Sequence, residues 1–398
     1  MRKMISDSQI REVAVGDVAG KRIVLRVDLN VPLDENGVAD GNSLRLSAAR
    51  ATIEKLQDMK ARIVVLAHRG DPNGIDLNMS LQPIVRSMMQ KMKSGPCLWQ
   101  SFAPLEEIHA RTMSLATSDV LFVENIRFFV GETKNDEEFS RELATLGDVF
   151  VNDAFGVCHR EHASVVGIAK HLPSFAGPTI LKETGALNRV VDNPARPFVA
   201  IAGGAKIHTK LSALLALLRG ADEVFVGGAL AAAFFKAKKM RIGVSQVELD
   251  DEKLAEILLK NSSLHLPEDV VVKNSSGETR LSSPDDIRSD EAIVDIGRNA
   301  IAAIATSARA AKTVVWNGPV GVIEETESRV GTDAVAHLLA EIGRGPAFVL
   351  AGGGETVDVI ESLKLSDFYD HVSVGGGAML EYIGGGKLPG LVALRNVE

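Results

Sequence analysis

Residues 198–218 read FVAIAGGAKIHTKLSALLALL, and this stretch indicates the fold of the chain. An apolar run of strand type, Phe198–Ile201, leads into Gly203–Gly204, and leucines at helical spacing follow in Leu211–Leu218. A strand, a glycine turn and a helix start place backbone amides where they can bind a phosphate. The stretch therefore predicts one strand–turn–helix unit of an α/β domain, with an anion site in the turn.

Two lysines stand in this turn. Lys206 and Lys210 are four residues apart, so on a helix they would share one face close to its start. Two adjacent ammonium groups repel each other unless an anion lies between them. The alternative is a solvated pair on an ordinary surface helix, which is the usual environment of lysine. Gly203–Gly204 favours the phosphate site, because glycine lets the backbone approach an anion closely.

Strand-like runs recur along the chain, with helical patterns between them. Most of them are nearly continuous apolar runs, typical of parallel strands that helices cover on both faces. This pattern predicts an α/β fold with two doubly wound parallel sheets. The clearest runs are Arg22–Asp28, Arg62–His68, Val120–Val123, Val149–Asn152, Phe198–Ile201, Glu223–Val226, Val270–Val272, Thr313–Trp316, Ala347–Leu350 and His371–Val374.

Length and composition limit the classes of protein to which the chain can belong. At 398 residues the chain is too long for one typical core, and we expect two domains that meet near Thr184–Pro197, where prolines interrupt a helical pattern. A formal net charge of −8 argues against general nucleic-acid binding, so any anion site has to be a local basic patch. Cys97 and Cys158 have no metal or redox spacing, and no run is long enough to span a membrane. We therefore expect a cytoplasmic protein.

The charged stretch Glu132–Glu142 is interpreted as a solvated surface helix without a function.

Polar residues follow the predicted strands of the first half, at the sheet edge where open α/β sheets bind ligands. Asp28 and Asn30 are two residues apart, so on an extended segment they point the same way and could hold a ligand hydroxyl. A surface ion pair explains each nearby basic residue taken singly. Together they predict a site for a small phosphorylated carboxylate, because guanidinium groups bind both kinds of anion in bidentate fashion. These basic residues are Arg26, Arg45, His68, Arg69, Arg127, His159, Arg160 and His162.

Glycine clusters follow the predicted strands of the second half, and they let the backbone approach a nucleotide closely. Glu355 could meet a Mg²⁺ ion, which prefers few carboxylates plus substrate phosphates, and Glu324 could accept a ribose hydroxyl. The chain has no Walker-A sequence and no kinase His-Arg-Asp loop. It also lacks the Gly-x-Gly-x-x-Gly fingerprint after its first strand, which weighs against a dinucleotide dehydrogenase. The clusters are Gly203–Gly204, Gly227–Gly228, Asn317–Pro319, Gly352–Gly354 and Gly375–Gly377.

Motifs in a fixed order extend over nearly all of the chain: Arg26–Pro32, Ser80–Pro83, Glu124–Phe128, Asn152–Ser164, Gly203–Lys210, Asp295–Gly297, Trp316–Val322, Gly352–Thr356 and Gly375–Ala378. In these motifs the chain resembles the phosphoglycerate kinase family. The resemblance implies two Rossmann-like domains that are joined by a hinge and face a cleft. Residues 1–185 would bind 3-phosphoglycerate, residues 186–385 would bind Mg-ADP or Mg-ATP, and a tail from about 386 to 398 would return to the N-terminal domain.

The activity that the resemblance implies is reversible, Mg²⁺-dependent phosphoryl transfer from 1,3-bisphosphoglycerate to ADP, by a monomer. Lys206 looks like the lysine that meets the transferring phosphoryl group, and Lys210 looks like the one on the nucleotide phosphates. The implied acid-substrate residues are Asp28, Asn30, Arg45, His68, Arg127 and Arg160, with Arg69 as a further candidate. The implied nucleotide residues are Gly204, Lys206, Lys210, Gly228, Asn317, Pro319, Glu324, Gly353, Gly354, Glu355 and Thr356, with Glu355 also on the metal. The implied catalytic set is Arg45, Lys206, Gly354 and Gly377.

The chain departs from the family pattern in four places. The usual His-Leu-Gly-Arg-Pro is His-Arg-Gly-Asp-Pro here, so Asp71 replaces a basic residue, and Arg69 would compensate for it only if the loop bends. The usual aspartate of the nucleotide loop is Glu355, a hydroxyl is lost at Val374, and a glycine is replaced by Ala229. Two alternatives therefore stay open: a non-catalytic nucleotide-binding relative, and an acyl-phosphate kinase with a different acid substrate.

Overall fold

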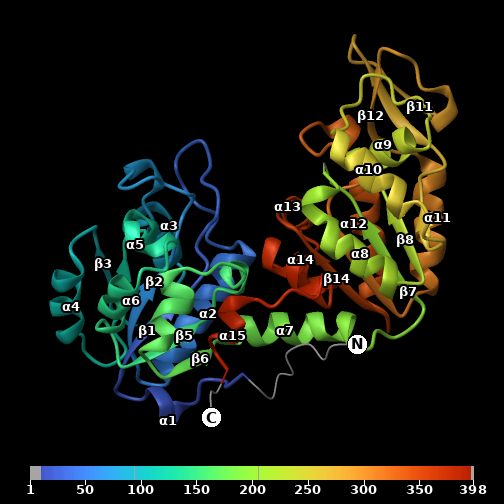
Figure 1. Ribbon diagram of the computed structural model, residues 1–398. Helices are drawn as coiled ribbons and strands as arrows, with labels where there is room; N and C mark the ends of the chain where they lie inside the picture. Colours follow the sequence, from blue (N-terminus) through green and yellow to red (C-terminus); the bar gives the residue numbers. More distant parts are fainter. Residues whose placement is uncertain (1–9, 94, 205, 396–398) are drawn as a thin grey trace. The chain divides into compact units, whose positions relative to one another are not determined.

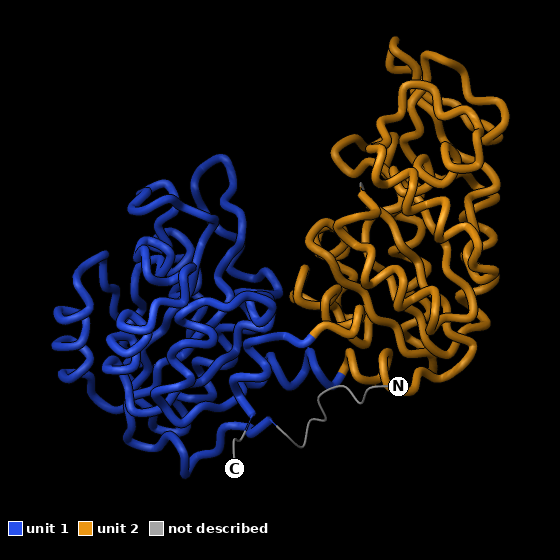
Figure 2. The backbone as a smooth tube through the Cα atoms, viewed as in Figure 1, with its two compact units in different colours: residues 1–185, 387–398 blue, residues 186–386 orange. Residues whose placement is uncertain are grey.

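The computed structural model describes residues 10–93, 95–204 and 206–395, and the chain divides into two compact units (Figure 2). Unit 1 comprises residues 1–185 and 387–398, and unit 2 comprises residues 186–386. Helix α7, Pro178–Val191, runs through the division (Figure 1).

A six-stranded parallel sheet forms the centre of unit 1, with the strand order β3-β4-β2-β1-β5-β6. In its central pair Arg22 stands opposite Arg62. Residues 23–25 are buried completely, which explains why this strand is a continuous apolar run without polar alternation. The strands are β1 (Arg22–Arg26), β2 (Arg62–Leu66), β3 (Cys97–Gln100), β4 (Val120–Val123), β5 (Val149–Asn152) and β6 (Ser174–Ala176).

Helices pack against this sheet. In α2, Leu46, Ile53 and Leu56 recur at helical spacing and enter the same core as the strands. The C-terminal segment also belongs to this unit, because Gly390 N donates to Cys158 O at 2.8 Å. The helices are α1 (Val15–Val18), α2 (Leu44–Asp58), α3 (Gln82–Met89), α4 (Leu105–Met113), α5 (Val130–Thr133), α6 (Glu137–Ala144) and α15 (Pro389–Val392).

Unit 2 is built on a second six-stranded parallel sheet, with the order β15-β14-β13-β7-β8-β9. Phe198 of β7 stands opposite Thr313 of β13, and β7 is buried along its whole length. The α/β fold with two parallel sheets is thus confirmed. The strands are β7 (Phe198–Ala202), β8 (Glu223–Val226), β9 (Leu264–His265), β13 (Thr313–Asn317), β14 (Phe348–Gly352) and β15 (His371–Ser373).

The helices of unit 2 bury apolar stripes beside this sheet. Ile304 of α11 and Leu339 of α12 share a core with Trp316 of β13. The helices are α8 (Leu211–Gly220), α9 (Ala229–Ala237), α10 (Leu249–Leu258), α11 (Arg298–Ala310), α12 (Val330–Gly343), α13 (Gly354–Ser362) and α14 (Gly377–Ile383). None of the helices in the described part of the chain is long and apolar enough to cross a membrane.

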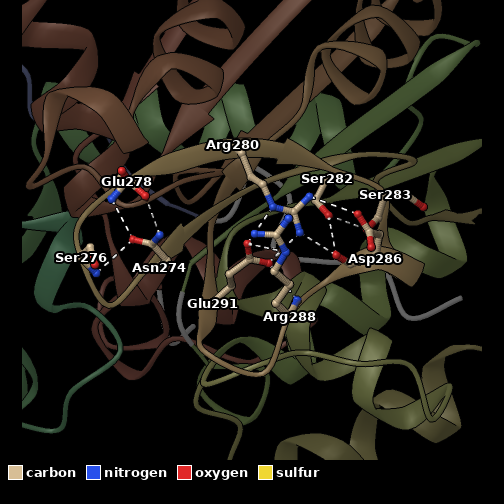
Figure 3. A network of polar contacts seen from close by, with 9 residues as sticks. All are labelled: Asn274, Ser276, Glu278, Arg280, Ser282, Ser283, Asp286, Arg288 and Glu291. Atoms are coloured by element: carbon tan, nitrogen blue, oxygen red, sulfur yellow. Dashed lines mark hydrogen bonds and ion pairs between the residues drawn. The ribbon is translucent and has the colours of Figure 1, made fainter.

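A separate antiparallel sheet in unit 2 corrects one expectation. The run at Val270–Val272 belongs to β10 (Val270–Asn274), which pairs antiparallel with β11 (Thr279–Ser282) and β12 (Glu291–Ile296). Val270 and Val272 are buried while Val271 is partly exposed, so only one face of this strand enters a core. Arg280 bridges the sheet, with Nε 2.7 Å and Nη2 2.8 Å from the two carboxylate oxygens of Glu291 (Figure 3).

The charged stretch Glu132–Glu142 is a second correction. It forms the end of α5 and most of α6 rather than one solvated helix. Glu132 is completely buried, and both of its carboxylate oxygens accept hydrogen bonds from Ser164. A charge run predicts exposure only on average, and here the first acid of the run lies inside unit 1.

Candidate active site

Basic side chains gather at the carboxyl ends of four neighbouring strands of unit 1. They are Arg26 at the end of β1, His68 after β2, Arg127 after β4, and Arg160 and His162 after β5. We call these five residues the basic cluster. Burial first, and then the charges of the other four members, hold the pKa of His68 well below its ordinary value. The histidine is therefore neutral near pH 7.

Asp28, Asn30 and Arg45 form a connected group beside this cluster. Asp28 Oδ1 accepts from Asn30 N at 2.9 Å, and Arg45 Nη1 donates to Asn30 O at 2.7 Å. Arg45 Nε stands 3.8 Å from Asp28 Oδ2. Asp28 and Asn30 are partly exposed around the buried Leu29, as expected of alternate residues on an extended segment.

Gly70 connects this group to Arg127. Its amide donates to Asn30 Oδ1 at 3.0 Å, and its carbonyl accepts from Arg127 Nη1 at 2.5 Å. Gly70 has φ +60°, and a Cβ there would stand 2.6 Å from Met79 Sδ, so the loop needs glycine. Arg127 Nε is buried and has no hydrogen-bond partner among the described residues.

Arg69 and Asp71, the two unusual residues of the loop after β2, have different surroundings. Asp71 Oδ1 stands 3.4 Å from Arg127 Nη1, and 77% of the Asp71 side chain is exposed. Arg69 Nη1 donates to the carbonyls of Asn78 and Ser80 at 2.8 and 3.1 Å. Its side chain therefore holds the loop after β2, and this placement does not favour Arg69 as the replacement for the arginine lost at 71.

In unit 2 the glycine loops after β7 and β13 are joined by main-chain contacts. Gly204 N donates to Pro319 O at 2.9 Å. Gly318 has φ +91°, and a Cβ on it would stand 2.2 Å from Gly203 O, so only glycine fits there. Trp316 Nε1 donates to Gly318 O at 2.9 Å from the core below.

Lys210 lies against these glycines. Its Nζ donates to Gly203 O at 2.8 Å, and a Cβ on Gly204 or on Gly318 would stand 2.6 Å from Nζ. Burial lowers the pKa of Lys210, and the nearby Glu355 opposes that shift. An ammonium carries three N–H groups, so this one can donate to an anion while it holds Gly203.

Lys206 is placed differently. It is exposed and precedes the 3₁₀ turn η7 (His208–Lys210), so the expectation that both lysines share one helical face was wrong. Asp251 of α10 holds this turn, because it accepts from His208 N at 2.8 Å and from His208 Nδ1 at 2.9 Å. Lys206 Nζ pairs with Glu248 Oε1 at 2.5 Å.

Three helices of unit 2 begin at the glycine clusters. Gly228 caps α9, Gly354 begins α13, and the exposed Gly377 begins α14. Helix starts of this kind present unpaired amides. Gly353, the residue before α13, has φ +104°, and the exposed Glu355 stands in the first turn of α13.

The loops after β13 and β14 are held by two buried side chains. Thr356 Oγ1 accepts from Gly318 N at 2.8 Å, and Asn317 Nδ2 donates to Gly352 O at 2.8 Å. Glu324 is exposed in the turn beyond β13. The loops that carry Gly204, Lys210, Asn317, Pro319 and Thr356 thus meet at one end of the unit 2 sheet.

Comparison with known proteins decides the family. The family model described as phosphoglycerate kinase matches residues 11–386. The chain belongs to the phosphoglycerate kinase family. It is 37% identical to the phosphoglycerate kinase of Nostoc sp., over 98% of this chain and 99% of that relative. It is 38% identical to phosphoglycerate kinase 3, cytosolic, of Arabidopsis thaliana, with the same coverage of both chains.

Solved structures agree with this membership. The phosphoglycerate kinase of Coxiella burnetii matches with a TM-score of 0.78 and 34% identity, over 95% of this chain and 96% of that one. The enzyme of Pyrococcus horikoshii matches with a TM-score of 0.82 and 30% identity, with the same coverage. As a member of the phosphoglycerate kinase family, the chain is a phosphotransferase of glycolysis.

Three residues beside these sites are not predicted as site residues by the sequence. The sequence pattern predicts a surface helix for Glu132 and no role for Ser164 or Glu248. No local pattern marks them, because each acts through a partner far along the chain: Ser164 binds Glu132, and Glu248 binds Lys206. Only the fold brings these pairs together.

Proposed function

We propose that the chain transfers a phosphoryl group reversibly between 1,3-bisphosphoglycerate and ADP, giving 3-phosphoglycerate and ATP, with Mg²⁺. The observation that carries the proposal is the buried Arg127 Nε, which lacks a partner among the described residues although Arg26, His68 and Arg160 stand close by. Buried donors in mutually repelling groups call for an anion. A phosphorylated carboxylate supplies two anionic groups for such a site.

In unit 1 the basic cluster would bind the acid substrate. Arg127 and Arg160 are the guanidinium donors, and the neutral His68 donates one further N–H. Asp28 and Asn30 would hold the substrate hydroxyl, and Arg45, paired loosely with Asp28 at 3.8 Å, would meet the moving phosphoryl group. Arg69 stays a candidate, but its contacts with Asn78 and Ser80 give it less support than the others.

In unit 2 the glycine loops would bind the nucleotide. Lys210 and the first amides of α13, from Gly354 to Thr356, would contact its phosphates, and Gly377 would offer amides to the moving phosphoryl group. Gly204, Gly228, Asn317 and Pro319 would shape the surface for the nucleotide. Glu324 would accept its ribose hydroxyl. Lys206 would leave Glu248 for the transferring group.

Glu355 fits a magnesium site, because it is an exposed carboxylate at the start of α13, where substrate phosphates would complete the ligands. When bound, Mg²⁺ neutralises charge on the nucleotide phosphates. The remaining charge falls to Lys206, Lys210 and Arg45.

The residues of the two sites would promote phosphoryl transfer by aligning the substrates and neutralising their charge. In the direction of ATP synthesis, the bond between phosphorus and the carboxylate oxygen of the acyl phosphate breaks as a bond to the terminal oxygen of ADP forms. The leaving carboxylate needs no proton, so no general acid is required. The residues have to align two anions and neutralise the equatorial oxygens between them. Because the two groups of residues belong to different units, we propose that the units close by a hinge motion to complete the site and exclude water.

A coupled assay tests the proposal. We expect the purified chain to make ATP from 1,3-bisphosphoglycerate, ADP and Mg²⁺, and we expect Lys206→Ala to abolish most of the turnover. Binding of ADP in calorimetry without any turnover would instead support a non-catalytic relative.

The position of Asp71 favours a second candidate function. Its carboxylate stands 3.4 Å from Arg127 Nη1 and competes with an anionic substrate for that cation. An acyl-phosphate kinase for a different acid would show turnover with another acyl phosphate only.

We further propose a cytoplasmic monomer, in line with the cytosolic relative and with the two free cysteines, Cys97 and Cys158.

A further inference from the structure

We propose that Glu132, Ser164 and Arg26 form a buried relay that positions His68 as a neutral donor, with its proton on Nε2. The relay lies wholly in unit 1 and extends from the buried Glu132 to Arg26 and His68 of the basic cluster. This inference rests on the proposed function only in naming the acid substrate as the acceptor of that proton. Glu132, Ser164 and Arg26 are positioning residues in it, because they act through His68.

The relay begins at a buried carboxylate. Ser164 lies in η5, a π-helical turn over Ala163–Gly167, and Glu132 and Ser164 are both completely buried. Ser164 N donates to Glu132 Oε2 at 2.9 Å, and Ser164 Oγ donates to Glu132 Oε1 at 2.6 Å. Both carboxylate oxygens therefore act as acceptors, as the ionised form requires. Burial raises the pKa of Glu132, and the Arg26 charge and the two Ser164 hydrogen bonds oppose that rise.

Arg26 continues the relay toward His68. Its guanidinium is completely buried and donates in three directions: Nε to Ser164 Oγ at 3.0 Å, Nη1 to Val27 O at 2.6 Å, and Nη2 to His68 Nδ1 at 3.1 Å. Ser164 Oγ accepts from Arg26, so its own hydrogen has to point to Glu132. The hydrogen-bond directions along the relay are thus determined from end to end.

The direction of the last bond decides the tautomer of His68. An arginine can only donate, so His68 Nδ1 has to accept, and the single ring proton then lies on Nε2. A second proton on Nδ1 would point at a cation. The charged or titratable groups around the ring, Arg26, Arg127, Arg160 and His162, all oppose it. His68 is thus left with one donor, and Nε2 is the atom that can give it to an anionic ligand.

Glu132 has a clear electrostatic reason to be in this place. A buried guanidinium without a counter-charge is strongly unfavourable, and Glu132 is the acid that most opposes the lowering of the Arg26 pKa by burial. It stabilises Arg26 from behind and leaves the substrate side of the cluster positive. Without Ser164 the carboxylate and the guanidinium would lose their shared contact, and Arg26 Nη2 would no longer be aimed at His68.

Nitrogen NMR of the full chain tests the tautomer directly. Ring-¹⁵N-labelled histidine is incorporated, and the His68 signals are assigned by their loss in His68→Asn. We expect a pyridine-type shift for Nδ1 and a pyrrole-type shift for Nε2 at pH 7. A protonated Nδ1, or an imidazolium, overturns the proposal. This readout needs only the wild-type chain and no substrate.

Two serine variants then test the relay. Ser164→Ala should mix the two tautomers of His68 and raise KM for 3-phosphoglycerate roughly tenfold, the effect of one misplaced hydrogen bond, while KM for ATP stays the same. Ser80→Ala is the matched control, since Ser80 Oγ donates to Glu124 Oε2 at the same 2.6 Å without touching Arg26. It should leave the His68 signals unchanged. Ser164→Thr keeps the hydroxyl and should retain the wild-type tautomer.

The outcomes separate the two proposals. His68 signals that are identical in Ser164→Ala and wild type overturn the relay, even if KM changes. If Ser164→Ala does not fold, the wild-type spectrum and Ser164→Thr still decide the matter. An absence of kinase turnover in the wild type overturns the proposed function and leaves the NMR result standing.

Discussion

Lys206 Nζ lies 2.5 Å from Glu248 Oε1, an ion pair between the turn after β7 and the residue that caps α10. About half of each side chain is exposed, so the pair can open without the cost of uncovering a buried charge. A lysine proposed to meet the moving phosphoryl group is thus held by a carboxylate that a phosphate has to displace.

Glu248→Gln should therefore tighten ATP binding. Removal of its exposed counter-ion leaves Lys206 free to bind phosphate, and the Kd for ATP should fall by up to about fivefold. The Kd for ADP, which lacks the transferring group, should fall less. Calorimetry with both nucleotides measures the difference. Glu252→Gln is the control, because Glu252 on the same helix pairs with Lys236 at 2.9 Å. Equal gains for ATP and ADP would contradict this role of Lys206.

Lys210→Met should weaken binding of both nucleotides. The ammonium lies among the glycines of the loops after β7 and β13, where a charge-assisted bond to a phosphate would contribute about 1.5–3 kcal/mol, or roughly 10- to 100-fold in Kd. Calorimetric titration with ADP measures it, and Lys236→Met on α9 serves as the control. An unchanged Kd for ADP would remove Lys210 from the nucleotide site.

Asp71→Asn should lower KM for 3-phosphoglycerate. The variant releases Arg127 from an exposed acid, and the gain should stay within about fivefold, as for other exposed pairs. Steady-state kinetics with varied 3-phosphoglycerate measures KM, with Glu107→Gln, an exposed acid on α4, as the control. A higher KM would mean that Asp71 takes part in recognition of 3-phosphoglycerate, and it would contradict the proposed competition between Asp71 and the substrate for Arg127.

Asp295 should make unit 2 less stable as the pH rises. Burial raises its pKa to about 7, against hydrogen bonds from Gly331 N and Ile296 N that lower it. The folded state then binds a proton that the unfolded state has already released. Its contribution to stability is therefore complete below the unfolded pKa and falls between about pH 4 and pH 7, by roughly 4 kcal/mol at most.

Urea unfolding of the wild type and of Asp295→Asn at several pH values measures this effect. The variant cannot titrate, so the stability of the wild type relative to the variant should fall from pH 4 to pH 7 and then level off. Asp290→Asn, at an exposed position, should give a difference that does not change with pH. A difference that grows with pH would contradict the sign of the shift.

The fold was predictable because parallel strands carry a strong local signal. Runs such as Phe198–Ile201 are apolar on both faces and are followed by glycine or by polar residues. The apolar runs therefore predict the fold class and the strand positions, and the residues that follow them predict the edge of the sheet where ligands bind. The sheet around β10 was harder to predict. Three valines in a row leave open whether one face or both enter a core, and only the partner strands decide that.

The candidate site was predictable as a set of residue types, and less so as a geometry. Gly203–Gly204 and Lys210 indicated an anion site from spacing alone. The same spacing predicts a shared helical face for Lys206, but Lys206 lies before the 3₁₀ turn and outside any helix. Arg69 is close enough in sequence to replace the arginine lost at 71, but its side chain binds backbone carbonyls instead.

Local pattern and motif order were enough to predict the two α/β sheets and the glycine loops, and motif order also indicated the family. Which charges face one another depends on the folded chain, which brings Glu132 to Arg26, Asp71 to Arg127 and Glu248 to Lys206. The physical reason is the range of the forces. Periodicity and backbone preference act within a few residues, whereas burial and charge act through space between segments far apart in the chain.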